Sequence, residues 1–494
     1  MVGSHSEAGG VSLRSILILM DSLNRHYLHA YEPSSWAKTP NIDRLSKKGV
    51  VFQRHFAGSL PCMPARRDLW TGRLSFLETP WGPRQPYDVC LTNELRSQRG
   101  VYSHLITDHY HYFEQAGSGY HTTFDSWEFV RGQESDPWHP MVHDPNVPVF
   151  RGRNKRQYWV NRTFADLQRE ENYPTPQCFQ RALDFLENNH GDDNWHLHLE
   201  VFDPHEPFVA PKEYRDLYQD DWDARFHFDW PAYAPVDPDI EDDAAIRHIR
   251  RSYAATLTMA DAWLGKLFDK MDELGMWEDT AVILTTDHGH LLGEHGYWAK
   301  NYMYDYRELV HIPLIIYHPH HGVQGARSNA LTSIIDLNAT ILDIHDAQVP
   351  SSVQGCSLLH LLDGDATHHR TVMYGYFGKD VSITDGNIIY TRQPRGDSVV
   401  HHHTAILPSL RPGTQVEVGT FLERFEYPVY RLTVPSRRHH GAPDGHLLYD
   451  LNIDPHQEHP LHNVELETEW ASRLRTVLNE YEAPRIQFSR LGLE

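Results

Sequence analysis

A short motif around a cysteine is the first place in this sequence where chemistry is indicated. Cys62 is followed by Pro64 and Arg66 in the spacing C-x-P-x-R. Proline suits the first turn of a helix, so Cys62 is expected near a helix N-terminus, where backbone N–H groups favour an anion. Arg66 lies about one helical turn further along and can reach the same place. Taken alone, the motif predicts little more than a cysteine at a helix start.

Two acidic residues stand at the ends of short apolar stretches. Residues 15–21 and 280–287 each have the pattern of a buried parallel strand, with Asp21 and Asp287 at their carboxyl ends. Ligands bind beyond these ends in parallel sheets, so the two carboxylates are expected in one site. Their oxygens suit Ca²⁺, Mg²⁺ or Mn²⁺, and His288 adds a nitrogen. A divalent cation there would also offset the charge of an anionic ester.

The order of motifs along the chain resembles the type I sulfatases, the formylglycine-dependent family of the alkaline-phosphatase superfamily. Beyond 62–66, the matching patterns are T-P-N-x-D-x-L at 39–45, T-D-H-G at 286–289 and L-Y-D-L at 448–451. The resemblance covers nearly the whole chain. It implies that a formylglycine-generating enzyme oxidises Cys62 to formylglycine, and that one divalent metal ion is held by Asp21, Cys62, Asp287 and His288.

The same resemblance implies roles for the remaining site residues. Arg66 would assist the nucleophile, and His109 would touch the oxygens of the anion. His111 would be the base that collapses the covalent intermediate. His205 is the favoured general acid for the departing alcohol, and Lys300 would neutralise the same ester oxygen. The reaction implied is hydrolysis of a sulfate monoester of a sugar, aryl or alkyl alcohol, through a covalent sulfo-enzyme intermediate.

Two positions depart from the commonest pattern of this family. Ser22 stands where many sulfatases have a second Asp, and His288 stands where many have Asn. Fewer carboxylates and one imidazole shift the preferred metal from Ca²⁺ toward Mn²⁺, with Mg²⁺ as a third candidate. Phosphonate monoester hydrolases likewise lack the second Asp and use Asp-His, so phosphonate monoesters and phosphodiesters remain open as substrates. Two further hypotheses are a non-catalytic binder of sulfated ligands and a two-metal phosphatase.

Alternating strands and helices must position these residues. Further strands are expected at 101–107, 195–202 and 313–317, and helices at 175–189, 242–274 and 333–345. The alternation predicts an α/β fold with a mostly parallel sheet between helices. The resemblance identifies this fold as the alkaline-phosphatase-like sandwich.

A change of pattern after residue 365 predicts a second, smaller unit. Short strands are expected at 372–376, 387–391 and 446–451, followed by a helix at 465–481, and we interpret the histidine triplet at 401–403 as part of a loop. The catalytic α/β domain is therefore placed at 1–365. A smaller C-terminal α+β subdomain with an antiparallel sheet, packed on that domain, is placed at 366–494.

The composition limits the partners that this chain can bind. A formal net charge of −22 argues against binding of nucleic acid. The sequence contains no apolar run of about 18 residues, so no membrane-spanning helix is expected. The four cysteines are far apart and lack zinc-binding spacing, and residues 1–10 do not have the pattern of a signal peptide, so a cytoplasmic location is expected. The expected partners are a small-molecule or saccharide sulfate ester and the formylglycine-generating enzyme. Assembly into a homo-oligomer is left open.

Overall fold

A computed structural model describes residues 13–364, 368–410, 412–422, 424–442 and 444–494. The predicted absence of a signal peptide at 1–10 and the predicted domain boundary between 365 and 366 both lie outside these residues, so they stay predictions. Within the described part of the chain, no helix is both long and apolar enough to cross a membrane.

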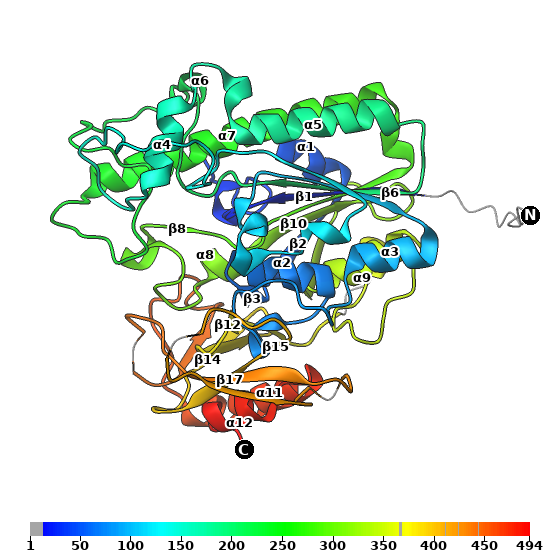
Figure 1. The fold of residues 1–494 in the computed structure, drawn as a ribbon, viewed down its shortest axis with the longest axis vertical. Helices are drawn as coiled ribbons and strands as arrows, with labels where there is room; N and C mark the ends of the chain where they lie inside the picture. Colours follow the sequence, from blue (N-terminus) through cyan, green and yellow to red (C-terminus); the bar gives the residue numbers. More distant parts are fainter. Residues whose placement is uncertain (1–12, 365–367, 411, 423, 443) are drawn as a thin grey trace, which may run out of the picture.

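An eight-stranded sheet forms the centre of the larger part of the molecule (Figure 1). Its strands, in spatial order, are β11 (Arg327–Ser333), β2 (Val50–Phe56), β10 (His311–Tyr317), β7 (Thr280–Thr285), β1 (Arg14–Met20), β6 (Trp195–Val201), β4 (Tyr102–Thr107) and β5 (Ser126–Phe129). Only β10 runs antiparallel to its neighbours. All seven residues of β1 are buried, as expected for a strand that helices cover on both faces.

Helices cover both faces of this sheet (Figure 1). On one face, α1 (Pro40–Lys48) and α5 (Pro174–Asn189) both pack against α7 (Asp243–Glu273). The other face carries α2 (Cys62–Thr71), α3 (Leu91–Arg99) and α9 (Asp336–Ile344). The predicted α/β fold with a large, mostly parallel sheet is therefore confirmed.

A five-stranded sheet lies next to the larger unit. Its order is β18 (Leu447–Asp450), β14 (Ile388–Arg392), β13 (Val381–Thr384), β12 (Val372–Tyr376) and β3 (Ser59–Leu60), and α11 (Val464–Glu480) and α12 (Arg485–Leu491) pack in the same unit (Figure 1). The predicted smaller antiparallel sheet is confirmed, although β3 pairs in parallel with β12. Because β3 ends two residues before Cys62, the small sheet fixes the backbone that leads into the cysteine motif.

The histidine triplet at 401–403 is not in a loop, contrary to the prediction. It belongs to β15 (Val399–Thr404), which forms a three-stranded sheet with β17 (Val429–Pro435) and β16 (Gln415–Gly419). Pairing of β15 with β17, some thirty residues away in the chain, satisfies the backbone of this polar stretch. Such a pairing leaves no local hydrophobic signal in the sequence.

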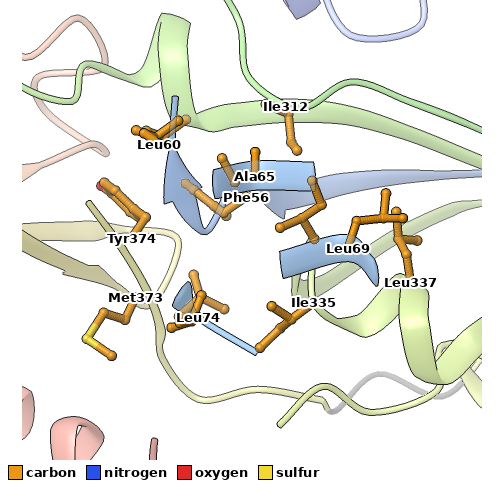
Figure 2. Close-up of a cluster of buried hydrophobic side chains, with 14 of the residues drawn as sticks. Phe56, Leu60, Ala65, Leu69, Leu74, Ile312, Ile335, Leu337, Met373 and Tyr374 are labelled. Carbon is orange, nitrogen blue, oxygen red and sulfur yellow. The ribbon is translucent and has the colours of Figure 1, made fainter. Parts of the chain in front are cut away.

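A buried apolar cluster joins α2 to both units. Figure 2 shows Leu69 of α2, Leu337 of α9 and Tyr374 of β12 around one core, and each is at most 1% exposed. Burial of such side chains contributes about 1.5–3 kcal/mol each. The helix that carries the cysteine motif is therefore held firmly between the large and the small sheet.

Candidate active site

Cys62 is the first residue of α2 and is only 3% exposed. Asp68, one and a half turns further along α2, accepts hydrogen bonds from the backbone N–H and the hydroxyl of Ser59, at 2.6 and 2.9 Å. These bonds tie the helix to β3 and so fix the direction in which α2 starts. Burial raises the pKa of the Cys62 thiol well above its usual value.

All four predicted metal ligands converge. One ligand atom from each of Asp21, Cys62, Asp287 and His288 lies within 4.8 Å of the others. Asp21 directly follows β1 and Asp287 lies two residues beyond β7, and these strands are parallel neighbours. The sheet therefore delivers both carboxylates to one place, as the sequence predicted.

The orientation of His288 suits a metal ligand. Its Nδ1 lies 2.9 Å from the carbonyl oxygen of Gly289 and donates to it, because a carbonyl only accepts. Its Nε2 then carries the lone pair and lies 3.2 Å from Sγ of Cys62. A ligating imidazole is usually held in this way by a hydrogen bond from its other nitrogen. Two carboxylates and a pre-oriented imidazole form a donor set that fits a divalent cation.

Arg66 bridges three buried carboxylates. Its guanidinium lies 2.8 Å from Asp21, 2.5 Å from Asp287 and 2.7 Å from Glu200. Burial opposes the positive charge, but Glu200 and the two aspartates outweigh it and raise the pKa of Arg66 well above normal. Burial likewise raises the pKa of Asp21, yet Arg66 and Lys300 bring it below its usual value. These groups are therefore charged.

Glu200 is a member of the site that the sequence analysis missed. It lies in β6, is fully buried, and its Oε1 accepts from both Nε and Nη2 of Arg66. Its other oxygen accepts a 2.6 Å hydrogen bond from the hydroxyl of Tyr112. The available signal was an acid inside an otherwise buried strand, since a buried carboxylate requires partners.

Lys300 is connected to Asp21 through Ser22. Its Nζ donates to Oγ of Ser22 at 3.1 Å, and that hydroxyl donates to Oδ1 of Asp21 at 2.8 Å. Burial lowers the pKa of Lys300, but the nearby Cys62 and carboxylates raise it above its usual value overall. The serine that replaces the second Asp of many sulfatases thus links the lysine to the first Asp.

His205 is a buried residue of the segment that follows β6. Its Nδ1 donates to the carbonyl oxygen of Glu206 at 2.5 Å, so Nε2 is the nitrogen left for a proton exchange. Burial lowers the pKa of His205 well below its usual value, which leaves the ring neutral. The neighbouring Glu206 also accepts a 2.5 Å hydrogen bond from Tyr233, which lies in the long segment between β6 and α7.

The two histidines that follow β4 have different surroundings. His109 is fully buried, its Nδ1 lies 4.0 Å from Asp21, and neither ring nitrogen has a hydrogen-bond partner among the described residues. The ring of His111 is 5.0 Å from that of His109, but its nitrogens face Glu114 at 2.7 Å and Glu134 at 3.5 Å. Burial lowers the pKa of His111, and these two acids outweigh it and raise that pKa. The geometry thus brings His109, but not His111, next to Asp21.

Comparisons with known proteins identify the family. The model of the family described as Sulfatase matches residues 15–347. The multifunctional alkaline phosphatase superfamily protein PehA of Trinickia caryophylli is 25% identical over 493 residues, which cover 87% of each chain. An arylsulfatase of Clostridium perfringens is 23% identical over 403 residues, 74% of this chain and 82% of the relative. The phosphonate monoester hydrolase of Agrobacterium radiobacter has the same fold, with a TM-score of 0.69 at 18% identity, over 95% of this chain and 96% of that one.

Proposed function

This chain belongs to the sulfatase family of hydrolases, and on that premise we propose that it hydrolyses sulfate monoesters with a formylglycine made from Cys62. The observation that carries the proposal is the convergence of Cys62, Arg66 and the metal-type ligands at the start of α2. A buried cysteine at a helix N-terminus, with a fixed guanidinium beside it, is suited to bind an anion. In its oxidised, hydrated form this residue would supply a hydroxyl nucleophile.

The charges around Cys62 support a requirement for a cation. Three carboxylates, those of Asp21, Asp287 and Glu200, face the two fixed cations Arg66 and Lys300. These five buried groups carry one excess negative charge, which would repel a sulfate ester. A divalent metal at Asp21, Asp287, His288 and residue 62 would reverse that sign and act as a Lewis acid on the nucleophile's oxygen. We propose Mn²⁺ or Ca²⁺ there, because the set mixes carboxylates with one imidazole.

The chain's own side chains would then bind and orient the ester. Arg66 is held by three carboxylates, so its position is set before substrate arrives, and preorganised donors of this kind are the main source of electrostatic stabilisation. His109 has two unpartnered nitrogens beside Asp21 and is assigned to the anion's oxygens. Lys300 is assigned to the ester oxygen that becomes the alcohol.

Two histidines are assigned to proton transfer. Nδ1 of His205 keeps its proton for the carbonyl of Glu206, so Nε2 would first take up a proton from water and then give it to the leaving alcohol, which returns the ring to its neutral form. His111 is proposed as the base that acts after the alcohol has left, with Glu114 and Glu134 to take up the positive charge of its protonated ring. The two roles are separable, because loss of the acid slows the first step and loss of the base slows the second.

A phosphonate monoester or phosphodiester is the second candidate substrate class. The specific observation that favours it is Ser22, which removes one carboxylate and binds Lys300 instead. Fewer negative ligands leave more positive charge for a substrate, which benefits a phosphorus ester as much as a sulfate. The hydrolysis of an aryl sulfate, a phenyl phosphonate and a phosphodiester therefore has to be compared on one enzyme sample.

The decisive test uses metal-loaded enzyme in which formylglycine at position 62 has been verified by peptide mass mapping. The expected result is a kcat/KM for sulfate monoesters that exceeds that for the phosphonate, and loss of both activities in Cys62→Ala. A kcat/KM for phosphonate that is larger by orders of magnitude would replace the sulfatase assignment with the second candidate. His360→Gln is a suitable control, because His360 is exposed and lies outside the residues assigned above.

A further inference from the structure

A second group of metal-type ligands lies away from Cys62. It consists of Asp336, the first residue of α9, and of His368 and His369, which precede β12. One ligand atom from each lies within 4.8 Å of the other two. The edge strand β11 leads into Asp336 and is three strands from β7 in the central sheet, about 14 Å at strand spacing. This group is therefore separate from the site at Asp287.

Both imidazoles present the same nitrogen to one carboxylate. Nε2 of His369 lies 2.8 and 3.0 Å from the two oxygens of Asp336, and Nε2 of His368 lies 3.3 Å from Oδ2. The side chain of Asp336 is fully buried and that of His368 is 4% exposed. Burial raises the pKa of Asp336, but the two imidazoles bring it below its usual value, so the carboxylate is anionic.

The contacts among these three residues leave one donor atom unsatisfied. Asp336 accepts backbone N–H groups from Ser333 at 2.8 Å and Cys356 at 2.9 Å, in addition to His369. Despite its closeness, Nε2 of His368 has no hydrogen-bond partner among the described residues. A buried polar atom without a partner costs about 1–3 kcal/mol. One protonated histidine would already neutralise Asp336, so an ion pair with His369 does not explain the position of His368.

We propose that Asp336, His368 and His369 bind a divalent transition-metal ion, with zinc as the best fit. Two imidazole nitrogens and one carboxylate oxygen are a zinc-type donor set, whereas Ca²⁺ and Mg²⁺ prefer oxygen alone. Each imidazole would use its Nε2, and the unpartnered nitrogen of His368 would gain a bond. His368, His369 and Cys356 help to line a cavity of about 1100 Å³, from which a water molecule would complete the coordination.

The position of the group indicates a structural role. Asp336 belongs to α9 of the larger unit, while His368 and His369 lie just before β12 of the smaller sheet. The backbone N–H of His369 also contacts the carbonyl of Leu331 in β11. A metal at this place would clamp the chain where it passes from the large sheet to the small one, independently of the reaction at Cys62.

The test measures zinc bound per chain in the full-length protein, after removal of metals by a chelator and titration with Zn²⁺ alone. Wild type is expected to bind one zinc more per chain than the double variant His368→Gln/His369→Gln. His360→Gln is the matched control, because its ring is 5.3 Å from that of His368 but is not among the converging atoms. The control should bind as much zinc as wild type.

The single variant His368→Gln keeps the test valid even if the double variant does not fold. His368→Gln keeps the contact between His369 and Asp336, so it is expected to fold and to retain wild-type hydrolysis. Its zinc dissociation constant at this site should rise at least about 100-fold, more than for loss of an outer-shell group. Equal zinc stoichiometry and affinity in wild type and His368→Gln would overturn the proposal and leave an Asp336–His369 ion pair only. An equal loss in His360→Gln would overturn it as well.

Discussion

Replacement of Glu200 by glutamine tests how Arg66 is held. In the metal-loaded enzyme Asp21 and Asp287 would bind the proposed cation, which would leave Glu200 as the carboxylate that serves Arg66 alone. Its Oε1 accepts from Nε at 2.8 Å and from Nη2 at 2.7 Å. Glutamine preserves the volume and one acceptor oxygen but removes the charge, so the change leaves the packing of β6 intact.

The size of the effect follows from burial. The side chains of Arg66 and of its three carboxylate partners are fully buried, and removal of one member of a buried ion pair costs about 3–5 kcal/mol. Because the amide oxygen can still accept one hydrogen bond, the lower end of that range is expected for the free energy of unfolding of Glu200→Gln. A loosened guanidinium should also reduce kcat by about 10–100-fold, as for other groups that orient a metal site from outside.

The assay combines denaturant unfolding with steady-state kinetics on metal-loaded enzyme. Tyr112→Phe is the graded control, since it removes only the 2.6 Å hydrogen bond to the other oxygen of Glu200. A hydrogen bond to a charged group contributes about 1.5–3 kcal/mol, so this variant should lose less stability and less activity than Glu200→Gln. The reasoning fails if Glu200→Gln unfolds at the wild-type denaturant concentration and keeps the wild-type kcat.

Three further outcomes are expected. Ser22→Ala should lower kcat/KM about tenfold, because one hydrogen bond to the charged Lys300 is lost; an unchanged value would show that this bond does not position the lysine. The pKa of His111 is raised on folding, so its protonated ring stabilises the folded protein. The free energy of unfolding of wild type relative to that of His111→Gln should therefore be largest below about pH 6.5 and decline as the pH rises through the folded pKa. A difference that does not depend on pH would contradict this. Leu69→Ala should lower the free energy of unfolding by about 2–5 kcal/mol without changing KM, as measured by denaturant titration and kinetics; a loss below about 1 kcal/mol would mean that α2 is not anchored as described.

The sequence was most informative about functional residues that directly follow a strongly apolar strand. Asp21 and Asp287 come after strongly apolar stretches, so their strands and the shared edge of the sheet could be predicted. Within the central sheet, strands β2, β5 and β11 were missed. β2 contains polar residues at half-buried positions, and β5 and β11 lie at the edges of the sheet, where burial is incomplete. Their patterns therefore resemble those of loops.

The site itself was only partly predictable, because the residues that hold Arg66 and His111 in place come from segments that are distant in the sequence. Glu200 and Arg66 are 134 positions apart in the sequence, and the residues near either of them do not indicate that the two side chains form a hydrogen bond. The contact of His111 with Glu134 likewise depends on a long loop whose course the sequence does not specify. Motifs with fixed spacing indicate which groups take part, whereas the orientation of each group is set by the packed sheet and helices.

The central claim, that Cys62 is the precursor of the nucleophile, is tested most directly by correlating activity with modification. Preparations made with different amounts of formylglycine-generating enzyme would be compared by the fraction of aldehyde at position 62, from peptide mass mapping, and by the rate of sulfate ester hydrolysis at saturating metal. The account predicts a rate proportional to that fraction, with no activity when it is zero. Full activity in a preparation whose Cys62 is entirely unmodified would contradict it.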